Sequence, residues 1–134
     1  MSTLRTSITL ASDTLFPTPV NFTKTVSESV DGYNNGFQQV TIAENSTVTI
    51  YNSENAAGNA GVVYFYAESL AANTTNINFG ISHDDDSSKF FARLIPGDIL
   101  YLPLWALDSA GITVFATNEA GAPAAVSFFI GEKE

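Results

Sequence analysis

Hydrophobic and polar residues alternate along most of this chain with a period of two, the spacing of side chains on one face of a β-strand. The pattern starts near the first residue, where Leu4, Ile8 and Leu10 fall on one face of an extended segment and Arg5 falls on the other. Segments of the same kind, rich in Val, Ile, Thr, Phe and Tyr, recur to the end of the chain. We expect strands at 4–10, 23–29, 37–42, 47–52, 62–68, 76–83, 89–95, 99–104, 112–117 and 124–130.

Clusters of Gly, Asn, Asp and Pro separate these segments at intervals of about 8–12 residues, which is typical of a β-sandwich or barrel. The clearest is the Pro-Gly-Asp turn at 96–98, where Pro fixes φ and Gly tolerates positive φ. No segment carries a sustained 3.6-residue apolar stripe. The pattern therefore predicts an all-β fold: a single-domain antiparallel β-sandwich of jelly-roll-like type over residues 1–134, with little or no helix.

The late strands are apolar on both faces, whereas a sandwich strand that faces water on one side carries polar residues there. Strict alternation assigns the faces: we expect Phe91 and Ile95 to oppose Phe90, Ala92 and Leu94, and Ile99, Tyr101 and Trp105 to oppose Leu100, Leu102 and Leu104. The second apolar face needs a cover, which a loop or the N-terminal segment of the same chain would supply as well as a subunit interface would. The candidate interface residues are Leu4, Ile8, Phe91, Tyr101 and Trp105.

Composition narrows the function mainly by exclusion. The 134 residues include 14 acidic and 5 basic side chains, which give a net charge of −9. Nucleic acid is a poor partner for such a surface, because phosphate backbones bind clustered cations. The absence of cysteine excludes disulfides and thiolate chemistry, and His83 is the only histidine. The chain shows no signal-peptide core and no apolar run of membrane-spanning length, so we expect a cytoplasmic product without a membrane partner.

One dense acidic cluster, Asp84, Asp85 and Asp86, is a candidate metal site, because hard cations such as Ca²⁺ bind several oxygen ligands. The spacing does not fit an EF-hand loop, in which Gly would replace Lys89 and Glu would replace Ile95. Such clusters are usually solvated turns, and this one lies between two predicted strands. We expect no cofactor.

No catalytic residues are predicted. The chain contains no Gly-x-Ser-x-Gly elbow and no phosphate-binding glycine loop, which argues against a hydrolase and against nucleotide chemistry. The acids that could form a glycosidase pair lie at turns or strand ends: Glu44, Glu54, Glu68, Asp98 and Asp108. Four aromatic residues could stack on sugar rings or pack in a core or interface: Tyr33, Phe37, Tyr51 and Trp105.

The C-terminal part of the chain has a recognisable order of elements. Residues 90–104 (FFARLIPGDILYLPL) comprise a strand, a Pro-Gly-Asp turn and an apolar strand ending in Pro, and 112–117 (ITVFAT) and 126–132 (VSFFIGE) close the set. This arrangement resembles small β-sandwich proteins of tailed-phage particles. Among these, the head decoration (capsid cement) proteins are the most similar in size and composition.

The resemblance implies a non-enzymatic virion protein, made in the host cytoplasm, that binds the major capsid protein on the outer face of the shell as a homotrimer. Residues 1–12 would then serve as a strand arm that contacts a neighbouring chain, since cement proteins use spare apolar faces and strand edges. Two other classes stay open. One is a phage tail or receptor-binding module that binds host glycans, and the other is a small all-β enzyme.

Overall fold

The computed structural model describes residues 2–14, 17–32, 37–52, 63–83, 89–104, 112–119 and 121–133. These residues form strands joined by turns and contain no helix, and hence no helix that could span a membrane. All ten predicted strands are present, most with ends within two residues of the prediction. They are β1 (Ser2–Ser12), β2 (Val20–Gly32), β3 (Gln38–Ile42), β4 (Ser46–Asn52), β5 (Val63–Ser69), β6 (Ile77–His83), β7 (Lys89–Leu94), β8 (Ile99–Leu104), β9 (Ile112–Asn118) and β10 (Ala124–Lys133).

The strands form two antiparallel sheets that pack face to face. The first sheet has the order β1-β2-β10-β5-β8. In this sheet β3 and β2 pair with the same edge of β10, β3 at residues 124–128 and β2 at residues 131–133. The second sheet has the order β4-β9-β6-β7. Without β1 and β2, the two sheets are β3-β10-β5-β8 and β4-β9-β6-β7. This is the strand order of an eight-stranded jelly roll, so the predicted fold class is confirmed.

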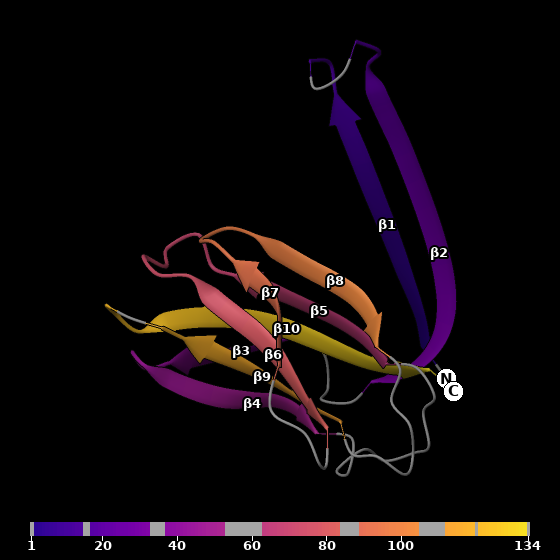
Figure 1. Cartoon of the computed structure of the whole chain (residues 1–134). Coiled ribbons are helices and arrows are strands. Elements are labelled where there is room, and N and C mark those ends of the chain that lie inside the picture. Colours follow the sequence, from indigo (N-terminus) through magenta and orange to yellow (C-terminus); the bar gives the residue numbers. More distant parts are fainter. Residues whose placement is uncertain are drawn as a thin grey trace.

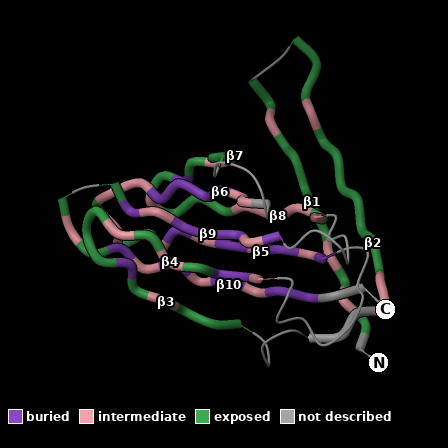
Figure 2. The backbone as a smooth tube through the Cα atoms, turned by 60° about the horizontal axis from the view of Figure 1, so that its bottom comes forward, coloured by how far each residue is buried: buried purple, intermediate pink, exposed green. Residues whose placement is uncertain are grey.

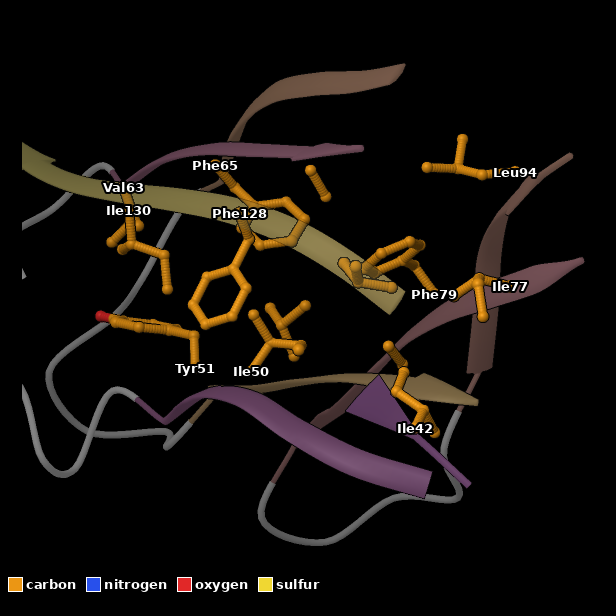
Figure 3. Close-up of a cluster of buried hydrophobic side chains, with 14 of the residues drawn as sticks. Ile42, Ile50, Tyr51, Val63, Phe65, Ile77, Phe79, Leu94, Phe128 and Ile130 are labelled. Atoms are coloured by element: carbon orange, nitrogen blue, oxygen red, sulfur yellow. The ribbon is translucent and has the colours of Figure 1, made fainter. Parts of the chain in front are cut away.

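The hydrophobic core lies between the two sheets (Figure 3). Alternate residues of each strand point inward, as the period of two predicts: Val63, Phe65 and Ala67 of β5 are at most 1% exposed. Phe65 meets Phe79 of the second sheet edge to face, with ring centroids 5.8 Å apart. Burial of this apolar surface is the main source of stability for the jelly roll.

The predicted Pro-Gly-Asp turn is present and is tied to the neighbouring strand. Gly97 has φ of 90°, and the amide of Asp98 donates to the carbonyl of Ile95 at 3.0 Å. The amide of Gly97 donates to the Ser69 carbonyl at 2.8 Å, and the Ser69 amide donates back to Asp98 at 3.0 Å. These bonds fix the end of β8 against β5, which sets the register of the first sheet at its outer edge.

A bulge in β7 changes one predicted face. Gly80 of β6 pairs with Phe90 and the preceding Phe79 pairs with Ala92, so Phe91 is the extra residue. Phe90 therefore leaves the face of Ala92 and packs edge to face on Phe115, with centroids 5.7 Å apart. The expectation that Phe90 shares a face with Ala92 and Leu94 is wrong, because strict alternation does not hold across a bulge.

β1 and β2 form a long hairpin that stands away from the jelly roll (Figure 1). Their register is unbroken from Ser2–Val30 to Ser12–Val20. The hairpin joins the rest of the first sheet through only three residue pairs, between 30–32 of β2 and 131–133 of β10. The predicted strand arm at residues 1–12 is thus one strand of a paired hairpin.

Candidate interaction surface

The hairpin has two chemically different faces. Directly paired residues of an antiparallel ladder share a face. The register Leu4–Glu28, Thr6–Val26, Ile8–Lys24 and Leu10–Phe22 therefore assembles one mostly apolar face, here called the inner face. On the opposite face, hydroxyl groups pair across the strands: Ser7 with Thr25 at 2.7 Å, and Thr9 with Thr23 at 3.1 Å.

The distal half of the inner face is exposed. Ile8, Leu10, Phe22 and Val26 are 45%, 57%, 50% and 44% exposed. Leu4, at the base of the hairpin, is partly buried. Figure 2 shows the contrast with the jelly roll, where the purple buried segments gather, while the hairpin is largely green. Contiguous exposed apolar side chains of this kind mark interaction sites more often than isolated ones do.

The outward side of the first sheet is aromatic. Tyr64, Tyr66, Tyr101 and Phe129 lie on it, since their neighbours in sequence point into the core, and Phe37 lies over Tyr66 and Phe129 with centroid distances of 5.6 and 5.7 Å. The rings of Tyr64 and Tyr101 are stacked at 6.5 Å, with 9° between their planes. We call these five residues the aromatic face.

The base of the hairpin lies against the aromatic face and leaves a pocket between them. The pocket has a volume of about 310 Å³ and is lined by Leu4, Arg5, Thr6, Ser7, Phe37, Tyr66, Tyr101 and Phe129. The Thr6 hydroxyl donates to the Tyr101 hydroxyl at 3.2 Å. Part of the cover that the sequence requires for this face therefore comes from the same chain. The pocket offers aromatic rings and hydroxyl groups to an apolar side chain or a sugar ring.

Glu68 is the acidic group beside the aromatic face. It lies two residues after Tyr66 on the same side of β5, and the Tyr66 hydroxyl donates to Glu68 Oε2 at 3.4 Å. Burial raises the pKa of Tyr66, and the charge of Glu68 and this hydrogen bond raise it further. Tyr66 is therefore a neutral hydrogen-bond donor at physiological pH.

The predicted interface residues fall at different places. Leu4 and Ile8 lie on the inner face of the hairpin. Tyr101 lies on the aromatic face, because it points to the opposite side of β8 from its neighbours Leu100 and Leu102, as predicted. Phe91 is 39% exposed at the bulge in β7, on the second sheet. The structure thus brings Leu4 and Tyr101 to one pocket and leaves Phe91 apart from it. Trp105 lies outside the described residues, as do Asp84, Asp85 and Asp86.

Tyr51 is not an exposed aromatic residue. It is 2% exposed and belongs to the core, so of its two predicted alternatives core packing is confirmed and sugar stacking is wrong. The reason is a bulge in β4 between Thr49 and Tyr51, which buries the consecutive residues Ile50 and Tyr51. Phe37, by contrast, is 71% exposed.

Two features of the surface escaped the sequence pattern. Phe22 and Val26 belong to a segment that resembles a polar strand, because Lys24 stands between them. Their spacing of four residues is the signal that would have placed them on one face with Lys24. The outward aromatic row across three strands could be found only with the strand order known. Among the described residues, no group of three His, Cys, Asp or Glu side chains could hold a metal.

No protein-family model, curated protein or solved structure matches this chain. Its function is therefore inferred from its own sequence and geometry. The projecting hairpin and the aromatic face are the features that require an explanation.

Proposed function

We propose that this protein is a non-enzymatic virion structural protein that binds the outer surface of a phage capsid as a decoration, or cement, protein. It is made in the host cytoplasm, contacts the major capsid protein and is a homotrimer. The observation that carries the proposal is the hairpin. It extends the first sheet beyond the jelly roll and exposes Ile8, Leu10, Phe22 and Val26 on one face.

Exposing such a row of apolar side chains to water is energetically unfavourable for an isolated protein. Full burial of one exposed Ile, Leu, Val or Phe side chain contributes about 1.5–3 kcal/mol. These four side chains are 44–57% exposed, so covering each contributes about half of that, and the row of four is a site for association. The free edge of β1 at the end of the first sheet can also pair with another strand. A protein that joins subunits of a shell needs both features.

Charge and fold agree with this role. A net charge of −9 keeps the chain from binding the nucleic acid inside the particle that it decorates. The jelly roll is a common architecture of viral capsid proteins and of lectins. Because one fold serves many functions, the fold supports the proposal only together with the hairpin.

The pocket favours one second candidate, a phage tail or receptor-binding module that binds host glycans. Its aromatic rings and the hydroxyls of Thr6, Tyr66 and Tyr101 suit a sugar ring. Binding on a glycan array that Tyr101→Ala abolishes would favour this function over capsid binding.

Purified particles of the phage that encodes the chain provide the test. We expect the chain in an integral ratio to the major capsid protein, with cryo-electron microscopy placing it on the outside of the shell. Particles that lack it should bind the purified wild-type chain and the Ala11→Lys variant but not Leu10→Lys, since Ala11 lies on the hydroxyl face. A chain absent from the particles, or located in the tail, would contradict the proposal.

A further inference from the structure

The inner face of the hairpin is mostly apolar and the aromatic face offers rings on which apolar side chains can pack. Within one chain, however, only the base of the hairpin lies against the aromatic face. We propose that the distal inner face of the hairpin docks on the aromatic face of a second copy of this chain. The inference rests on the self-association in the proposed function and locates its interface. The docked residues are the same row that carries the proposed function, so Leu10→Lys would disturb both contacts, and self-association measured without particles tells them apart.

The shape of the hairpin explains why the partner is another copy. Leu4 to Ser7 already line the pocket on their own aromatic face. Leu10 lies six residues beyond Leu4, a distance of about 20 Å along a strand, and the hairpin leads away from the sheet (Figure 1). The distal residues therefore extend beyond their own jelly roll, on the same face of the hairpin as Thr6, which bonds to Tyr101 at the base.

Charge complementarity supports the same pairing. Lys24 pairs with Ile8 in the hairpin and is the one cation of the inner face. It makes no ion pair with the part of the chain that the structure describes, and neither does Glu68 beside the aromatic face. Glu28, the acid of the inner face, lies at the base opposite Leu4. Docking of the distal part would therefore place a row of apolar side chains with one cation on a row of aromatic side chains with one anion.

The distribution of charge along the chain also favours a contact between the hairpin of one copy and the jelly roll of another. Residues 1–32 hold two basic and three acidic side chains, and the rest of the chain holds three basic and eleven acidic ones. A hairpin of net charge −1 approaches a body of net charge −8 with much less repulsion than two bodies would experience. An anionic lipid surface would need clustered cations, which the inner face lacks.

The contact is head to tail, since it joins two different surfaces. Such contacts close into rings when the rotation between copies permits. A ring of three copies, each covering the aromatic face of the next, matches the trimer that the proposed function includes.

Crosslinking between two single-cysteine variants tests the pairing. The natural chain has no cysteine, so each variant carries one thiol. Leu10→Cys mixed with Ile99→Cys, on the outward side of β8, should give covalent dimers with a bismaleimide. Ala11→Cys mixed with Ile99→Cys is the matched control and should give at least five-fold less. Equal yields from the two mixtures, or crosslinking only within a chain that carries both Leu10→Cys and Ile99→Cys, would overturn the proposal.

Charge reversal tests the partner residues. Lys24→Glu and Glu68→Lys should each weaken self-association about five-fold, and the double variant should restore it to within about two-fold. A double variant no better than the weaker single variant would overturn the assignment of this pair. Circular dichroism checks that each variant retains its β-sheet spectrum.

These measurements use no capsid. Crosslinked copies of a chain that never binds particles would support the interface and reject the capsid function. A monomer that binds particles would do the reverse.

Discussion

The hydroxyl of Thr6 donates to the hydroxyl of Tyr101, 95 residues away in the sequence, at 3.2 Å. Thr6 belongs to the first strand of the projecting hairpin and Tyr101 to the edge strand at the other side of the first sheet. Beside this bond lies a pocket with aromatic walls. The bond brings the base of the inner face onto the aromatic face within one chain, and the proposed contact between copies extends this juxtaposition to the distal residues.

Removing this bond should loosen the base of the hairpin without unfolding the jelly roll. Tyr101→Phe keeps the ring and its stacking on Tyr64 but removes the acceptor. We expect the free energy of unfolding in urea to fall by about 1 kcal/mol or less, because the bond is only partly buried. Relative to the wild type, amide hydrogen exchange in the variant should become faster in β1 and stay unchanged in β9. A loss above about 3 kcal/mol would show that Tyr101 has a larger structural role.

Gly80 should not tolerate a side chain. The ring of Phe115 lies directly over it, and a Cβ atom would overlap the ring carbons. Gly80→Ala should lower the free energy of unfolding by about 1–3 kcal/mol. Replacing Phe115 by Leu makes room, so Gly80→Ala should cost less in a Phe115→Leu background, as measured by a double-mutant cycle in urea. Equal costs in both backgrounds would contradict the overlap.

Asn118 should be essential to the connections between strands. Its buried amide donates to the carbonyls of Ile42, Ala43 and Ala122 at 2.7–3.4 Å, and its oxygen accepts from the Thr75 hydroxyl at 3.0 Å. Asn118→Leu leaves these groups without their partner and should cost about 2–5 kcal/mol. Thr117→Val, the neighbouring change on the outward side of β9, should cost less than about 1 kcal/mol. Thermal unfolding of both variants checks the difference.

The ionisation of Tyr66 should depend on Glu68. Burial, the charge of Glu68 and their hydrogen bond raise its pKa above the ordinary value of 10.0. The folded state therefore holds this proton more tightly than the unfolded chain. The resulting stabilisation is complete below pH 10 and is lost as the pH rises through the folded pKa. Glu68→Gln should lower the Tyr66 pKa in an ultraviolet titration, and Tyr66→Phe should remove that step. A titration unchanged by Glu68→Gln would contradict the contact.

The sequence predicts the strands well because alternation is a local property. Each segment from 4–10 to 124–130 carries its own period of two, and the turn at 96–98 carries its own glycine. The two bulges are different, since each depends on the register between neighbouring strands. They reversed the expectation for Phe90 and buried Tyr51.

The make-up of the two candidate faces could be predicted only in part, for a related reason. The sides on which Leu4, Ile8 and Tyr101 lie follow from their alternation with polar or inward-facing residues. That Phe22 and Val26 join Leu4 and Ile8 follows from the pairing of β1 with β2, and that Phe37 and Phe129 join Tyr101 follows from the strand order. Pairing between segments far apart in sequence leaves little trace in a single chain.

The mass of the purified 134-residue chain in solution, measured by light scattering over a range of concentrations, tests the central claim most directly. We predict a multiple of the 14.3 kDa protomer, three-fold if the ring closes as a trimer. Phe22→Lys, on the inner face, should reduce the mass to that of the protomer, whereas Asn21→Lys, on the hydroxyl face, should leave it unchanged. A wild-type mass of 14.3 kDa at every concentration, or the same behaviour from both variants, would contradict the account.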